Sequence, residues 1–235
     1  MRSSRFQNPI FVALDVSDLA AAESLARAVK PHVGGFKIGL EFITAQGPQG
    51  VRRIVELGLP VFADTKFHDI PNTVAGAARA IARLGVQIFN VHASGGEEMM
   101  RTAADSAREI DPSITIIAVT VLTSLDDGDL AAVGQCSPAS DQAARLAALA
   151  KGSGLDGAVS SAREIGAIRK ICGSEFLIVT PGIRPAGGDI GDQRRVMGPR
   201  EALQAGADVL VIGRPITRAA DPKAAAQAIL AELGS

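Results

Sequence analysis

Five charged residues lie within or just beyond the first three apolar runs of the chain: Asp15, Lys37, Asp64, Lys66 and Asp69. Asp64 and Lys66 are two residues apart, so on an extended strand their side chains point to the same side. At about 4 Å and an effective dielectric constant of about 20, each opposite pair gains on the order of 4 kcal/mol before the desolvation cost is subtracted. A network of this kind stabilises a fold poorly, but it suits catalysis. A lone Asp or Lys at a strand end is, by contrast, most often solvated.

Some of these residues also have simpler structural interpretations. Asp69 precedes the sequence Ile-Pro-Asn-Thr and resembles a helix N-cap, with Pro71 in the first turn. The three histidines are expected to be structural, and only His92, at the end of an apolar run, is a candidate for more.

A second set of polar residues follows the last two apolar runs. The segment "TPGIRPAGGDIGDQRR" (180–195) is rich in glycine, and "IGRP" contains Gly213 and Arg214. Such a segment is commonly only a surface loop. In an α/β barrel, however, the loops after the seventh and eighth strands often bind phosphate. A glycine lets an anion approach the backbone N–H groups, and an arginine can bind a phosphate through two hydrogen bonds.

Eight short apolar runs alternate with longer amphipathic segments along the chain. The runs span residues 10–16, 35–40, 61–66, 86–92, 114–120, 155–160, 176–182 and 208–214. They are nearly continuous in Val, Ile, Leu and Phe, which is typical of parallel strands covered on both faces. Between them, residues 18–30 and 73–85 carry apolar side chains at helical spacing.

This alternation predicts a single (β/α)8 TIM barrel that occupies residues 1–235 as one domain. Four glycines precede strands at positions suited to ending a helix: Gly58, Gly85, Gly173 and Gly206. Eight units in 235 residues give 235/8, about 29 residues per unit, which is a normal βα length. The alternative is an open, doubly wound sheet, but no GxGxxG motif follows the first run.

Composition excludes several classes of function. The chain has 24 basic and 25 acidic residues and no Trp or Tyr, so neither a basic surface nor stacking platforms for a nucleic acid are expected. It has no signal-peptide pattern and no apolar stretch long enough for a membrane span. Cys136 and Cys172 lack metal-binding spacing and are expected to be reduced thiols. We therefore expect a cytoplasmic protein that binds neither nucleic acid nor membranes.

The charged segment resembles a known family. "FADTKFHDIPNTV" (62–74) is similar to the D-x-K-x-x-D signature of the bacterial orotidine-monophosphate decarboxylases. The resemblance continues in order through "VALDV", "FKIGLE", "NVHASGG", "AVTVLTS", "TPGIRP", "GDQRRVM" and "VIGRPIT". The motif alone occurs in sugar-phosphate decarboxylases and synthases on related barrels, whereas the ordered set is specific. It implies decarboxylation of orotidine 5'-monophosphate (OMP) to UMP and CO2 in pyrimidine biosynthesis, without metal or cofactor.

The resemblance also implies roles for individual residues. Lys66 would protonate C6 of the pyrimidine as CO2 leaves, and Asp64 would lie against the substrate carboxylate. Lys37 would hold Asp64 and a ribose hydroxyl, while Asp15 would bind the ribose. Thr123 would contact the edge of the pyrimidine. Departure of CO2 leaves a carbanion that the ring cannot easily delocalise, so a nearby ammonium group can stabilise the charge and then deliver the proton.

The resemblance further implies a homodimer with shared active sites, because Asp69, Ile70 and Thr73 would reach into the neighbouring subunit's site. The rest of the segment would belong to the substrate-binding region: Thr65, Phe67, His68, Pro71 and Asn72. At the phosphate end, the implied substrate-binding residues are Arg184, Gln193, Gly213 and Arg214, with the glycine-rich segment closing over them as a lid.

Two alternatives compete with this interpretation. A magnesium-dependent sugar-phosphate decarboxylase or aldolase of the same suprafamily would place an acidic metal ligand on the second strand, where Lys37 would instead repel a divalent cation. A regulatory barrel that binds nucleotides without chemistry would be expected to lose one of the five charged residues, yet all five are present.

Overall fold

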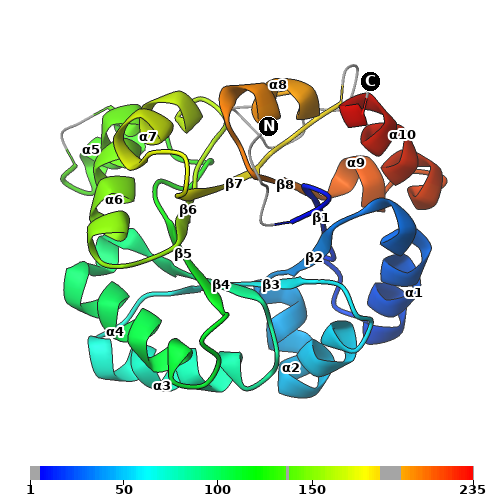
Figure 1. Cartoon of the computed structure of the whole chain (residues 1–235), viewed down its shortest axis with the longest axis horizontal. Coiled ribbons are helices and arrows are strands. Elements are labelled where there is room, and N and C mark those ends of the chain that lie inside the picture. Colours follow the sequence, from blue (N-terminus) through cyan, green and yellow to red (C-terminus); the bar gives the residue numbers. More distant parts are fainter. Residues whose placement is uncertain (1–5, 136–137, 186–196, 235) are drawn as a thin grey trace.

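Eight parallel strands close into one barrel in the computed structural model, which describes residues 6–135, 138–185 and 197–234. The strands pair in chain order, and β1 closes the barrel against β8 (Figure 1). Their bounds are β1 Ile10–Ala13, β2 Gly35–Ile38, β3 Val61–Phe67, β4 Ile88–His92, β5 Thr115–Val119, β6 Gly157–Val159, β7 Leu177–Pro181 and β8 Val209–Ile212. The predicted (β/α)8 barrel is therefore confirmed. Seven of the eight apolar runs contain a strand, and β3 extends one residue beyond the predicted run 61–66.

Helices form an outer ring around these strands (Figure 1). The α-helices of the described residues are α1 Leu19–Val29, α2 Leu40–Val55, α3 Pro71–Ala82, α4 Glu97–Arg108, α5 Asp127–Ala132, α6 Ala139–Gly152, α7 Ile165–Cys172, α8 Pro199–Ala205, α9 Arg214–Thr217 and α10 Pro222–Gly234. Two short 3-10 helices are η1 Lys30–His32 and η2 Ala93–Gly95. No helix in the described part of the chain is both long and apolar enough to cross a membrane.

The helix ends follow local rules, with one exception to the predictions. The four glycines predicted to end helices all have positive φ, between 78° and 112°. Asp69, however, is not the N-cap of α3, because Ile70 occupies that position. Pro71 lacks an N–H group and takes the first helical position, which places the helix boundary at Ile70. The carboxylate of Asp69 instead accepts the N–H of Ile70 at 2.6 Å.

The barrel encloses an inner apolar core that is separate from the core between strands and helices. Its members are Phe11, Ala13, Phe62, Ile88, Ile117, Leu177, Val179, Val209 and Val211. Phe11 fills the space beside Gly35, where an added Cβ would lie 2.5 Å from the Phe11 ring. Glycine at position 35 therefore gives an aromatic ring room inside the barrel, directly below the next inward residue of β2.

Side chains at the amino ends of alternate strands accept hydrogen bonds from the backbone of neighbouring strands. Gln87, Asp156 and Asp208 each stand one residue before a strand, namely β4, β6 and β8. Their oxygens accept the backbone N–H groups of Val61, Ile116 and Ile178 at 2.7–2.8 Å. Polar groups at this end thus stabilise the fold, which leaves the carboxyl ends of the strands for a functional site.

Candidate active site

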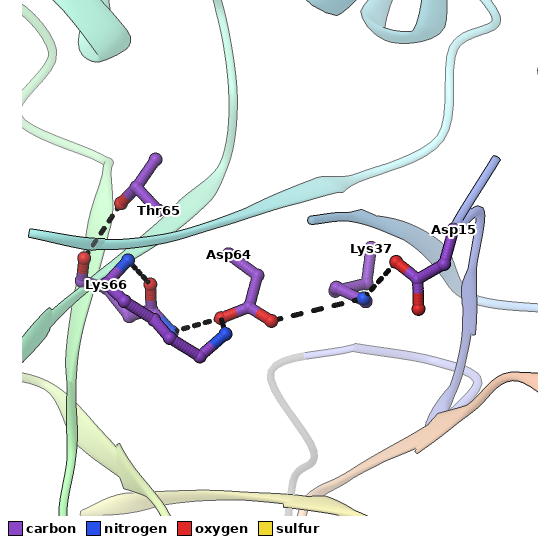
Figure 2. A network of polar contacts seen from close by, with 6 residues as sticks. Asp15, Lys37, Asp64, Thr65 and Lys66 are labelled. Carbon is purple, nitrogen blue, oxygen red and sulfur yellow. Dashed lines mark hydrogen bonds and ion pairs between the residues drawn. The ribbon is translucent and has the colours of Figure 1, made fainter. Parts of the chain in front are cut away.

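Four charged side chains form a continuous chain across the carboxyl ends of β1, β2 and β3 (Figure 2). The Lys37 ammonium lies 2.5 Å from Asp15 Oδ1 and 3.9 Å from Asp64 Oδ2. The other oxygen of Asp64 lies 2.6 Å from the Lys66 ammonium. Signs alternate along the chain, so each carboxylate faces at least one ammonium group. The structure therefore brings together four of the five charged residues that the sequence singled out.

The strand period explains why these charges meet inside the barrel. Side chains two residues apart on a strand share a face, so Lys37 follows Gly35 and Asp64 follows Phe62 on the inward side. The charged layer thus lies one step above the inner apolar core. Lys37 is the most enclosed of these groups, with 8% of its side chain exposed, whereas 48% of the Asp15 side chain is exposed.

Lys66 lies in an irregular part of β3. The pairing of β3 with β4 shifts between Ala63 and Phe67, and Lys66 has a φ of 51°, which is uncommon for a residue other than glycine. The expectation that Asp64 and Lys66 share a side is confirmed, since their charged groups touch. Their backbone is not that of a regular strand, however.

Asn90 of β4 contacts this irregular segment, and the sequence reasoning did not identify it. Its side chain is fully buried, donates to Asp64 Oδ1 at 2.7 Å and accepts the N–H of Lys66 at 2.7 Å. A signal was available in the run "VQIFNVH" (86–92). There Asn90 is a polar residue on the same face as His92, within a strand that pairs with the one carrying Asp64.

Two adjoining cavities open beside the charged chain. The arginine cavity, of about 410 Å³, is lined by Ala13, Asp15, Lys37, Glu41, Asp64, Pro181, Gly182, Arg184, Val211, Gly213, Arg214, Thr217 and Arg218. The Lys66 cavity, of about 170 Å³, is lined by Phe62, Asp64, Lys66, Val119, Val121, Leu122, Thr123, Val159, Pro181 and Val211. Asp64, Pro181 and Val211 line both cavities, so the two form one continuous site.

Several predicted site residues line these cavities, and others do not. Asp15, Lys37, Asp64, Lys66, Thr123, Arg184, Gly213 and Arg214 are cavity-lining residues. Thr65 is buried, and its hydroxyl donates to the carbonyl of Asn90 at 2.8 Å. Phe67 packs toward the outer core against Phe89, with ring centroids 6.1 Å apart. Gln193 lies outside the described residues, as do Cys136 and the part of the glycine-rich segment from residue 186 onward.

Residues 69–73 line neither the arginine cavity nor the Lys66 cavity of their own chain. Asp69, Asn72 and Thr73 are exposed at the start of α3, beside the partly exposed Pro71. Ile70 is a large apolar residue that is 67% exposed. A single chain therefore does not bring residues 69–73 into contact with its own charged chain.

His68 and His92 form a stacked pair beside Lys66, with ring centroids 5.6 Å apart. Burial lowers the pKa of His92 below its ordinary value of 6.5, and the positive charges of His68 and Lys66 lower it further, against a smaller opposite effect of Asp64. At neutral pH, His92 is therefore an uncharged ring. Among the described residues, no group of three or more His, Cys, Asp or Glu side chains is placed to hold a metal ion.

The arrangement has three chemically distinct parts. Arg184, Arg214 and Arg218 give one end of the site positive charge suited to an anion with several oxygens. Asp15 and Lys37 offer an acceptor and a donor for hydroxyl groups in the middle. At the other end, Lys66 projects an ammonium group into a small, mainly apolar cavity. Such a site can bind a molecule with an anionic tail, a polyhydroxyl centre and a compact ring.

Comparison with known proteins gives a consistent result. The family model for "Orotidine 5'-phosphate decarboxylase / HUMPS family" matches residues 8–229. An orotidine 5'-phosphate decarboxylase of Moorella thermoacetica is 60% identical, with 97% of this chain and 92% of that protein aligned. One from Paramagnetospirillum magneticum is 51% identical, with 97% and 99% aligned. The crystal structure of orotidine 5'-phosphate decarboxylase from Lactobacillus acidophilus has a TM-score of 0.86 at 36% identity, covering 97% of this chain and all of that one.

Proposed function

We propose, because the chain belongs to the orotidine 5'-phosphate decarboxylase / HUMPS family, that it decarboxylates OMP to UMP. The observation that carries the proposal is the contact between Lys66 and Asp64, which both line a mainly apolar cavity. An ammonium group in this position can meet negative charge that develops on a carbon atom.

The three parts of the site match the three parts of the nucleotide. The phosphate binds at Arg184 and Arg214, beside Gly213. The ribose hydroxyls bind Asp15 and Lys37 in the middle of the site. The pyrimidine enters the Lys66 cavity, where Thr123 contacts its edge and apolar side chains cover its faces.

The chemistry follows from this placement. The bond between C6 and the carboxylate breaks, CO2 leaves, and the electron pair of the bond remains on C6. The Lys66 ammonium stabilises this charge and transfers one proton to C6, and the resulting amine regains a proton from solvent. Asp64 lies against the departing carboxylate. Binding of the remote phosphate positions the ring, so part of its binding energy lowers the barrier.

The active unit in this proposal is a homodimer. Residues 69–73 line neither the arginine cavity nor the Lys66 cavity of the described residues, and Ile70 exposes a large apolar side chain at the surface. A single exposed apolar residue is ordinary on a protein surface, so the dimer is supported by the family resemblance, which places this segment in the neighbouring subunit's site. We infer that Asp69 and Thr73 complete the site of the partner subunit.

The proposed reaction is independent of divalent metal ions. Each carboxylate of the charged chain already faces an ammonium group, and Lys37 lies between Asp15 and Asp64, where a bound cation would otherwise be expected. The Lys37 ammonium would repel a divalent cation from these carboxylates.

The test is the loss of orotate ultraviolet absorbance when purified protein is added to OMP. We expect turnover in the presence of excess chelator, at a rate that added magnesium does not change. Absence of turnover would contradict the proposed function. Turnover that requires magnesium would instead favour the rival metal-dependent activity, for which sugar-phosphate substrates should then be assayed under the same conditions.

A further inference from the structure

We propose that Asn90 is a positioning residue that sets the relative placement of Asp64 and Lys66 for catalysis. It touches neither of the two cavities, yet it hydrogen-bonds to every residue from Asp64 to Lys66. The inference rests on the proposed decarboxylase function, because it assigns Asn90 a role in that reaction.

The register of the sheet places Asn90 opposite a bulge in β3. Ala63 pairs with Phe89, and Phe67 pairs with Val91. Three residues of β3, numbers 64 to 66, therefore stand opposite a single residue of β4, Asn90. Bulges of this kind redirect side chains and are frequent next to active sites. Here the bulge brings both charged side chains to the cavity edge.

Asn90 makes three hydrogen bonds across this bulge. Its side-chain NH2 donates to Asp64 Oδ1 at 2.7 Å, and its side-chain oxygen accepts the Lys66 N–H at 2.7 Å. Its backbone carbonyl accepts the Thr65 hydroxyl at 2.8 Å. Asn90 is fully buried, so water cannot replace these partners. These hydrogen bonds of Asn90 therefore hold the bulge in its conformation, which we call the template role of Asn90.

The backbone of Lys66 has an uncommon conformation. Its φ of 51° lies in the left-handed region, which is unfavourable for a residue with a Cβ atom. Such a conformation persists where surrounding contacts determine it. The hydrogen bond from the Lys66 N–H to the Asn90 side-chain oxygen holds the backbone of this residue.

The carboxylate of Asp64 is oriented in part by Asn90. Its Oδ1 accepts from both the Lys66 ammonium and the Asn90 amide, while its Oδ2 faces Lys37 at 3.9 Å. The amide thus fixes the rotation of the carboxylate about its last bond. Without it, Asp64 could turn, and the Lys66 ammonium that it orients would move from its place.

A positioning role predicts a specific kinetic pattern. Asn90→Leu keeps a similar side-chain size but removes both amide bonds, so we expect kcat to fall about 10- to 100-fold. The KM for OMP and the dissociation constant for UMP should change less than about threefold, because the phosphate and ribose contacts stay intact. Ile116→Val, in the outer core of β5, is the matched control for lost stability and should leave kcat within about twofold.

Asn90→Asp gives a readout that a purely structural role would not move. When protonated, the new carboxyl group can donate to Asp64 and accept from Lys66, as the amide does. When ionised, it loses the donor and repels Asp64. We therefore expect kcat of Asn90→Asp to decline with rising pH, in a range where kcat of the unmodified protein is flat and circular dichroism shows the variant folded.

The outcome that would overturn the proposal is a folded Asn90→Leu variant with at least half the normal kcat, or one in which KM rises while kcat is unchanged. A pH profile of Asn90→Asp that parallels that of the unmodified protein would also count against it.

A crystal structure of Asn90→Leu provides a test that needs no activity. We expect residues 64–66 to change conformation and Lys66 to leave positive φ, and an unchanged bulge would refute the template role. If the unmodified protein fails to turn over OMP while the bulge of the variant rearranges, the proposed function is wrong and the structural role of Asn90 stands.

Discussion

Gly39 lies immediately above the first ion pair of the site, and its lack of a side chain is a requirement of that pair. A Cβ added at position 39 would lie 3.0 Å from Asp15 Oδ1 and 3.1 Å from the Lys37 ammonium nitrogen. The backbone of Gly39 has a φ of −101°, which any residue can adopt. Gly39→Ala therefore perturbs the charged chain sterically, without straining its own backbone.

The size of the effect follows from these distances. Ordinary contacts begin at 3.4 Å, so Asp15 and Lys37 must each retreat by 0.3–0.4 Å. Lys37 is almost fully enclosed, whereas Asp15 is about half exposed and moves more easily. Overpacking costs about 1–3 kcal/mol, and a mobile neighbour places this site near the lower end. We expect kcat/KM for OMP to fall by roughly 10-fold, since about 1.4 kcal/mol corresponds to a factor of ten.

The assay compares two glycine-to-alanine variants by steady-state kinetics and urea unfolding. Gly166 lies in α7, and an added Cβ there would meet no atom within 4 Å. Gly166→Ala should leave kcat/KM unchanged and raise the free energy of unfolding by about 0.5–1 kcal/mol. If Gly39→Ala also keeps its full kcat/KM, the close approach to Asp15 and Lys37 has no functional consequence, and the reasoning is refuted.

Three further predictions concern Lys66, the proposed sharing of the site between subunits, and His92. Lys66→Ala should lose nearly all turnover while its urea unfolding curve stays close to that of the unmodified protein, and substantial residual turnover would show that another group delivers the proton. Mixing the two inactive variants Lys66→Ala and Asp69→Ala should restore about a quarter of the normal activity, because half of the randomly formed dimers contain one intact site; no recovery after proven subunit exchange would contradict a shared site. The lowered pKa of His92 means that the folded protein binds fewer protons than the unfolded chain below pH 6.5. Stability should therefore fall as pH drops below about 6.5, and the fall should be smaller in His92→Gln, as measured by urea unfolding between pH 7 and 5; equal slopes for both proteins would assign the pH dependence to other groups.

The sequence predicted the barrel because its strongest signals are local. Each strand is a short apolar run covered on both faces, and glycines such as Gly58 and Gly85 adopt the positive φ that their place at helix ends requires. The predicted limits were less accurate. The first run was extended to residue 16, whereas β1 ends at Ala13, so that Asp15 stands beyond the strand and partly in solvent.

The charged chain was predictable for the same reason, whereas the bulge was not. The spacing of Asp64 and Lys66 was sufficient to place both on one side of β3. The position of Lys66 also depends on Asn90, a residue of another strand whose effect appears only when two strands pair. The assignment of Asp69 as a helix cap was wrong although a local signal was available, because proline prefers the first helical position and Pro71 therefore places the cap at Ile70.

The filled interior of the barrel makes the site a blind pocket. Phe11, Phe62 and Ile88 are at most 2% exposed and seal the space directly beneath the charged layer, and the ring of Phe6 packs edge-on against Phe11 from below. A small molecule that reaches Lys66 must therefore both enter and leave at the carboxyl end of the barrel. Product release must therefore precede the binding of the next substrate molecule.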